Sequence, residues 1–230
     1  MEYYIFPTPD LFVSEVNNLS KSGVLSDPKN KQTASVFLSR VLADNSDKTL
    51  KWLKELEHLN KTDMETVFYA VWLSDTKESK EYLKSIGATQ ALETKPTNFL
   101  QVPIDSPSTL DALWAYFFAT GQKEPVRRIV SALNYENHSG ALEEYKTSQQ
   151  TEQDKQDAIL DSIFRPALWS LESNIKQHPR VAEICGVLFK GKSLTNSEQL
   201  WLGVVLSKAL PNKYKMSKTE PGQWTVQTLK

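Results

Sequence analysis

Residues 112–133 read ALWAYFFATGQKEPVRRIVSAL, and residues 167–188 repeat that pattern without a gap as ALWSLESNIKQHPRVAEICGVL. The identical positions fall on helical spacing; they are Ala112 and Ala167, Leu113 and Leu168, Trp114 and Trp169, Gln122 and Gln177, Val126 and Val181, Ile129 and Ile184, and Leu133 and Leu188. Self-similarity of this kind is typical of helical hairpins that stack and bury their apolar faces against neighbouring copies. The repeat therefore predicts that both segments form helix–turn–helix units that superpose.

Fainter copies of the pattern occur at residues 36–43, 67–74 and 200–206. Small residues take equivalent places in the better copies, namely Ser39, Ala70 and Ala115. Small side chains let a helix approach its neighbour closely, while the larger ones beside them fill the remaining space. Because the spacing of the copies is irregular, we expect an all-α fold made of an irregular stack of antiparallel helical hairpins.

Residues typical of helix starts and helix ends lie between these segments and support the helical interpretation. Asp27 before Pro28 is expected to start one helix, and Thr62 or Asp63 to start another, because short polar side chains cap helix N-termini. Gly23 and Gly87 follow apolar periodic stretches in the manner of glycines that end helices.

In its helix–turn–helix pairs and small packing positions, the chain resembles the tetratricopeptide and related α-solenoid superfamily over residues 30–210. The resemblance implies stacked hairpins with a concave surface that binds a protein or peptide. The copies do not keep the tetratricopeptide consensus of fixed tryptophan, leucine, glycine and tyrosine positions. No binding residue of the family is therefore transferred to this chain.

The domain organisation follows from where this helical pattern stops. Residues 1–211 are expected to form a single helical-repeat domain, or alternatively two lobes divided at the 88–108 connection, which contains Pro96, Pro103 and Pro107. The apolar residues of that connection are expected to pack along a helix groove rather than to bind a ligand. Residues 212–230 are expected to form an extended basic tail.

Composition narrows the class of partner. Among 230 residues, 27 lysines and arginines nearly balance 28 aspartates and glutamates, so no overall field favours nucleic acid as a partner. No stretch approaches the roughly 20 apolar residues of a membrane span, and no signal peptide is apparent. We expect a cytoplasmic protein, or an exported or periplasmic one if Met1 replaced a signal peptide. The oligomeric state stays open.

The residue types that usually act as catalytic groups or metal ligands do not cluster in this sequence. Cys185 is the single cysteine and lies in an apolar run, so it is expected to be a buried thiol, with no disulfide or zinc-binding thiolates. His58, His138 and His178 lack metal-ligand spacing. The acidic residues Asp154, Asp157 and Asp161 share one helical stripe and are expected to face solvent rather than hold a cation. The sequence therefore predicts no catalytic residue, metal or cofactor.

Aromatic residues and one arginine pair are the better candidates for binding. There are more large aromatics than one helix face hides, so most, including Trp114 and Trp169, are expected in the core, with a few lining a groove. Arg127 and Arg128 are expected to pair with carboxylates of neighbouring helices. The candidate binding residues are Trp114, Tyr116, Arg127, Arg128 and Trp224.

Three functions fit these observations. The first is a non-enzymatic scaffold that binds a protein or peptide on a concave face. The second is an enzyme whose site is dispersed between helices, for example over His138, Glu143 and Arg127. The third is a structural subunit of a larger assembly, tethered by Trp224 and the tail. The balance favours a non-enzymatic role.

Overall fold

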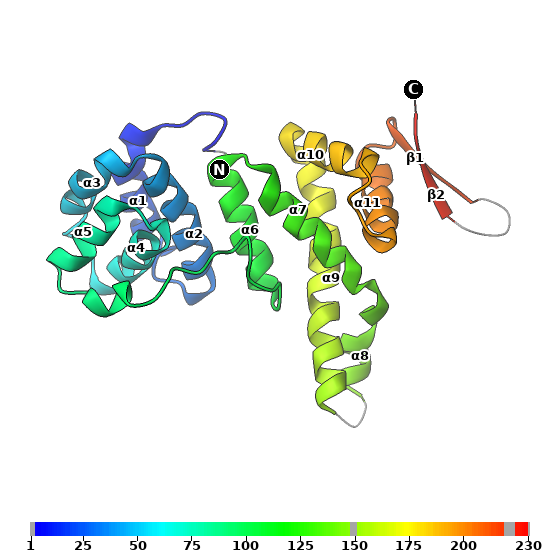
Figure 1. The fold of residues 1–230 in the computed structure, drawn as a ribbon, viewed down its shortest axis with the longest axis horizontal. Helices are drawn as coiled ribbons and strands as arrows, with labels where there is room; N and C mark the ends of the chain where they lie inside the picture. Colours follow the sequence, from blue (N-terminus) through cyan, green and yellow to red (C-terminus); the bar gives the residue numbers. More distant parts are fainter. Residues whose placement is uncertain (1–2, 148–150, 219–223, 230) are drawn as a thin grey trace. The chain divides into compact units, whose positions relative to one another are not determined.

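The computed structural model describes residues 3–147, 151–218 and 224–229, and within these ranges helices dominate (Figure 1). The all-α class predicted from the sequence is confirmed, since the only sheet in the described ranges is a two-stranded hairpin. None of the helices there has both the length and the apolar character needed to cross a membrane. The chain folds as two compact units, Met1–Val102 with Trp114–Gly121, and Pro103–Leu113 with Gln122–Lys230.

The first unit consists of helices in chain order, joined by short turns except for the long connection before α6. They are η1 (Pro9–Leu11), α1 (Phe12–Lys21), α2 (Pro28–Asp44), η2 (Ser46–Lys48), α3 (Thr49–Glu55), α4 (Lys61–Ser74), α5 (Lys77–Ser85), η3 (Thr89–Leu92) and the end of α6 (Pro107–Thr120). Asp27 caps α2 as predicted, with its carboxylate accepting the Lys29 N–H at 2.9 Å. The cap of α4 is Asn60 rather than Thr62 or Asp63, because the Asn60 amide oxygen accepts the Asp63 N–H at 3.1 Å.

The core of the first unit forms where α2 packs against α4. Small polar residues at this contact satisfy one another: the Ser35 hydroxyl donates to the Thr66 carbonyl at 3.0 Å, and the Thr66 hydroxyl donates to the Leu25 carbonyl at 2.7 Å. Ser39 and Ala70, which the repeat pattern marked as packing positions, are buried. Small side chains therefore bring the two backbones together, as the sequence pattern predicted.

The second unit is built around one long helix. Its elements are α7 (Lys123–Ser131), η4 (Ala132–His138), α8 (Ala141–Tyr145), α9 (Glu152–Gln177), α10 (Pro179–Lys190), α11 (Asn196–Ala209), β1 (Tyr214–Lys218) and β2 (Trp224–Thr228). Helices α8, α10 and α11 and the turn η4 all pack against α9. Pro166 lies inside α9, so the helix continues through it instead of starting there.

The two repeated segments both form a helix, a short connection and a second helix, α6 with α7 and α9 with α10. The first segment is divided between the two units, so its superposition on the second stays a prediction. The prediction that both tryptophans lie in the core is wrong for one of them: Trp114 is 6% exposed, whereas Trp169 is 73% exposed. Glu172 and Ser173 follow Trp169 on the same stripe of α9, and a stripe with such polar neighbours faces solvent.

The acidic stripe at the start of α9 also differs from the prediction. Asp161 is fully buried, not solvated, because its Oδ2 atom accepts the backbone N–H groups of Gly140 and Leu142 at 3.2 and 3.1 Å. Arg165 completes the set with an Nε donor 3.1 Å from Oδ1. Asp161 thus satisfies backbone donors at the start of α8, a role that buried carboxylates often take.

Residues 214–218 and 224–228 of the tail form the two strands of an antiparallel hairpin, with Tyr214 opposite Thr228. This hairpin packs against α11, where a Cβ atom at Gly203 would lie 2.7 Å from Val226 Cγ2. The ring of Tyr214 is buried with its edge toward Phe189. Trp224 begins β2, but its side chain lies outside the described part of the chain.

Cys185 is buried in α10, as the sequence predicts, and desolvation raises the pKa of its thiol to about 12. Because the thiolate is the reactive form, we expect no reaction of the folded chain with a chromogenic disulfide reagent at about pH 8. The chain unfolded in urea should react completely. Reaction of the folded and unfolded chains at the same rate would contradict the burial of this thiol.

Candidate functional site

The sequence-predicted binding residues are distributed over both units. Trp114 and Tyr116 belong to the first unit, whereas Arg127, Arg128 and Trp224 belong to the second. Each set is therefore described within its own unit.

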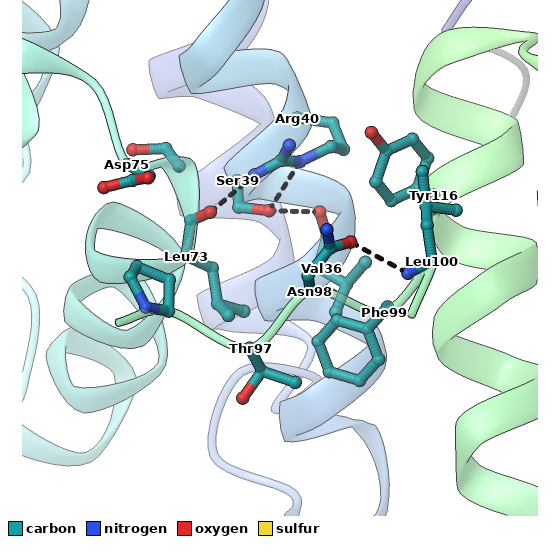
Figure 2. A pocket seen from close by; sticks show the side chains of 12 residues that line it. Val36, Ser39, Arg40, Leu73, Asp75, Thr97, Asn98, Phe99, Leu100 and Tyr116 are labelled. Carbon is teal, nitrogen blue, oxygen red and sulfur yellow. Dashed lines mark hydrogen bonds between the residues drawn. The ribbon is translucent and has the colours of Figure 1, made fainter. Parts of the chain in front are cut away.

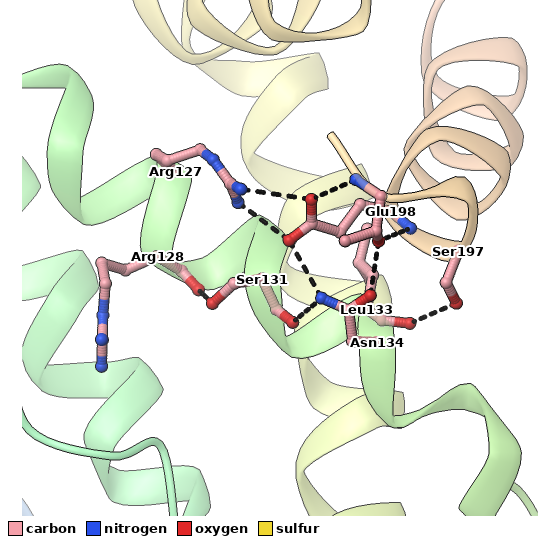
Figure 3. Close-up of polar contacts among 8 residues, drawn as sticks. Arg127, Arg128, Ser131, Leu133, Asn134, Ser197 and Glu198 are labelled. Atoms are coloured by element: carbon pink, nitrogen blue, oxygen red, sulfur yellow. Dashed lines mark hydrogen bonds and ion pairs between the residues drawn. The ribbon is translucent and has the colours of Figure 1, made fainter. Parts of the chain in front are cut away.

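Arg127 is held by a buried carboxylate in the second unit (Figure 3). Its Nη1 and Nη2 atoms lie 3.0 and 3.2 Å from the two oxygens of Glu198, which is only 2% exposed. Figure 3 shows Arg128 pointing away from this carboxylate. The expected pairing with a carboxylate of another helix is confirmed for Arg127.

Glu198 has two further donors, on η4 and at the start of α11. Asn134 donates its side-chain N–H to Oε1 at 3.0 Å, and the Thr195 backbone N–H donates to Oε2 at 2.9 Å. In return, the Thr195 hydroxyl accepts the Glu198 N–H, which completes a capping box at the start of α11. Every group around this carboxylate is used in joining α7, η4 and α11, so the cluster is a structural network rather than an open site.

The residues named for a dispersed enzyme site have separate partners. Nδ1 of His138 lies 3.1 Å from Asp157, and Glu143 pairs with Lys146 at 3.0 Å. Arg127 pairs with Glu198. No contact among His138, Glu143 and Arg127 is therefore seen in the described part of the chain.

Trp114 and Tyr116 take different places on α6. Trp114 is buried against Phe118, with ring centroids 5.9 Å apart, and is a core residue. Tyr116 is half-buried and lines a cavity of about 360 Å³ in the first unit (Figure 2). This cavity, named here the Arg40 pocket, is lined by Val36, Ser39, Arg40, Leu73, Ser74, Asp75, Pro96, Thr97, Asn98, Phe99, Leu100 and Tyr116.

Arg40 is the central charge of this pocket. Its Nη2 atom donates to the Leu73 carbonyl at 2.5 Å, so it satisfies one of the last carbonyls of α4, which have no partner within the helix. Its Nε atom donates to the Ser39 hydroxyl at 3.2 Å, and its guanidinium lies 5.2 Å from the centroid of the Tyr116 ring. These contacts fix the plane of the guanidinium at the pocket wall.

The opposite wall is a hydrogen-bonded turn in the connection after η3. The side-chain oxygen of Asn98 accepts the Leu100 N–H at 3.0 Å, and its carbonyl accepts the Gln101 N–H at 2.9 Å. These bonds determine which way the amide points, and Figure 2 shows its nitrogen on the side that faces Arg40. Phe99 is buried next to it, which confirms that an apolar residue of the connection packs on the helices.

Asp75 stands at the rim with its own counter-charge. It ends α4 in the left-handed conformation, with φ of 56°, and its carboxylate lies 2.7 Å from the Lys80 ammonium. Farther along α2, desolvation raises the pKa of Asp44, and the charge of Arg40 opposes that rise. Within the described ranges, no carboxylate forms an ion pair with Arg40, and the charged residues that line the pocket are Arg40 and Asp75.

A second cavity of about 690 Å³ adjoins the pocket and shares Asp75, Pro96 and Asn98 with it. It lies between helices α4 and α5 and the connection, which is attached to α4 by a bond of 2.7 Å from the Trp72 indole N–H to the Ala91 carbonyl. The two adjoining cavities are named together here the connection groove. Lys80, Lys95 and Gln101 also line it.

The Ser39, Arg40 and Asp75 side chains of the Arg40 pocket have partners within the unit. Asp75, the one acidic residue among those lining the Arg40 pocket, is paired with Lys80, and the Ser39 hydroxyl donates to the Val36 carbonyl at 2.7 Å. A nucleophile needs a base within reach, and this serine has none among its contacts. The pocket instead offers guanidinium and amide donors.

Among the sequence-predicted binding residues, only Tyr116 lines this cavity, and the prediction did not include Arg40, Asn98 or Asp75. One signal was available for Arg40: it lies on the same helix face as Val36 and Phe37, four and three residues before it, and a charge in such a place needs a partner. No sequence signal brings residue 98 to residue 40.

Comparison with known protein families, curated proteins and solved structures finds no match to this chain.

Proposed function

We propose that this chain is a non-enzymatic binding module that takes an extended peptide segment of a protein partner in the connection groove. The observation that carries the proposal is that the two cavities share Asp75, Pro96 and Asn98 in their walls. A groove with polar walls suits a peptide, whose backbone needs donors and acceptors along its whole length.

The character of the walls supports this choice. Charges of both signs line the groove, with Arg40, Lys80 and Lys95 against Asp75 and Glu93. Apolar surface is also present, from Trp72, Leu83 and Leu92. Mixed polar and apolar contacts of this kind give a peptide both orientation and affinity.

The proposal is tested by selecting binders from a phage-displayed library of random linear peptides and measuring the enriched peptides by fluorescence anisotropy. Gln101 is exposed and lines the groove, so Gln101→Trp should narrow it and weaken binding by about tenfold or more. The matched control is Gln90→Trp, an exposed residue of η3 that does not line either cavity. Failure to enrich any peptide, or equal weakening by both variants, would refute the groove as the binding site.

A further inference from the structure

The Arg40 guanidinium has unused hydrogen-bonding capacity. An arginine side chain carries five N–H donors, and the described contacts of Arg40 use Nε for Ser39 and one hydrogen of Nη2 for the Leu73 carbonyl. Nη1 and the second hydrogen of Nη2 have no acceptor among the described residues. These atoms form the end of the guanidinium fork, the edge that binds a carboxylate through two parallel bonds.

The surroundings favour an anion at that edge. The Tyr116 ring covers the guanidinium, and Arg40 itself is half-buried, which reduces the competition from water for its remaining donors. Asn98 adds a neutral amide donor on the facing wall. An arginine fixed by three contacts loses little conformational freedom when it binds, so its charge is preorganised for a ligand.

Charge balance selects the class of anion. The pocket offers one guanidinium charge, from Arg40, which forms no ion pair among the described residues, while Asp75 at the rim is paired with Lys80. A monoanion matches that single charge. A phosphate dianion would leave excess negative charge next to Asp75, which costs free energy in a partly desolvated site.

We infer that the Arg40 pocket is a carboxylate-binding subsite, in which Arg40 and Asn98 receive an acidic side chain or the C-terminal carboxylate of the bound peptide. This inference rests on the proposed peptide-binding function for its biological ligand, but the subsite itself is tested with a small probe. The carboxylate lies end-on to the guanidinium, and the rest of the peptide continues into the adjoining cavity.

Acetate is the first probe, with acetamide as its neutral analogue and inorganic phosphate as the competing anion. The Nε–H signal of Arg40 is followed by ¹⁵N-correlated NMR and assigned from its loss in Arg40→Lys. We expect a saturable shift with acetate and binding at least about tenfold weaker with acetamide. An unmoved signal, an equal response to acetamide, or tighter binding of phosphate than of acetate would each overturn the carboxylate assignment.

Enriched peptides then separate this inference from the proposed function. Arg40→Gln should weaken them by about tenfold, while Arg180→Gln, which removes an exposed arginine of the second unit, should leave binding unchanged. Loss of affinity on amidating the C-terminus identifies a terminal carboxylate, and loss on replacing Asp or Glu by its amide identifies a side chain. Peptides that bind Arg40→Gln as tightly as the wild type would overturn the subsite but keep the proposed function. Acetate binding without any enriched peptide would keep the subsite but overturn the proposed function.

Discussion

Replacing Glu198 with alanine is expected to lower the free energy of unfolding by about 3 to 5 kcal/mol, because it removes one partner of a buried ion pair. Arg127 would lose both of its carboxylate bonds, and its side chain is only 24% exposed. The Thr195 N–H and the Asn134 amide would lose an acceptor at the same time. The partly buried donors left without an acceptor account for most of the expected loss.

Urea denaturation followed by tryptophan fluorescence measures this loss, and amide exchange at Thr195 reports it locally. Glu198→Gln keeps an acceptor for the cap but removes the charge, so its loss should lie between those of the wild type and alanine variants. Glu183→Ala is the matched control, because Glu183 pairs with Arg180 on the surface, and exposed pairs contribute about 1 kcal/mol or less. A loss in Glu198→Ala no greater than in this control would show that the network does not stabilise the second unit.

Phe164→Ala is expected to cost about 3 to 5 kcal/mol, since it removes a large buried ring from the core of the second unit. Phe164 is almost fully buried on α9 and meets Trp201 of α11 edge to face, with ring centroids 5.2 Å apart. The cavity left behind lies between the two helices, where neighbouring side chains fill it only in part.

Two further variants serve as controls for the expected loss of stability in Phe164→Ala. Phe164→Leu keeps most of the apolar volume and should cost less than about 1.5 kcal/mol. Trp169→Ala, on the same helix, removes an even larger ring that stands in solvent and should change stability by no more than about 0.5 kcal/mol. Equal losses for Phe164→Ala and Trp169→Ala in thermal unfolding would contradict the burial described here.

That contrast shows what the repeat pattern was able to predict. Helical spacing and capping residues predicted the helices well, because Asp27 and Gly87 act through neighbours a few residues away. Burial depends on what lies across from a side chain. Trp114 and Trp169 match in sequence, yet Trp114 meets Phe118 on its own helix and Trp169 is followed by polar residues.

The candidate site was less accessible from the sequence for the same reason. Arg40, Asn98 and Tyr116 lie on α2, the connection and α6, and none carries a local motif. Their meeting depends on the packing of α2 against α4 and on the attachment of the connection through Trp72. Asp161 shows that a pattern typical of a solvated stripe can also hide a buried residue. Its carboxylate accepts backbone N–H groups at the start of α8, about 20 residues earlier in the chain, and no local pattern indicates that contact.

The division of α6 between the two units affects how the chain folds during its synthesis. Unit 1 needs no residue beyond Gly121, so it is complete as soon as that residue has left the ribosome. Residues 103–113 have also emerged by then, but they belong to the other unit, and Leu110 and Leu113 are buried in the finished protein. At usual translation rates, residues 122–230 follow over roughly 5 to 20 s. During that interval the buried faces of this stretch lack their partners from the second unit, so we expect chaperones to bind the nascent chain there.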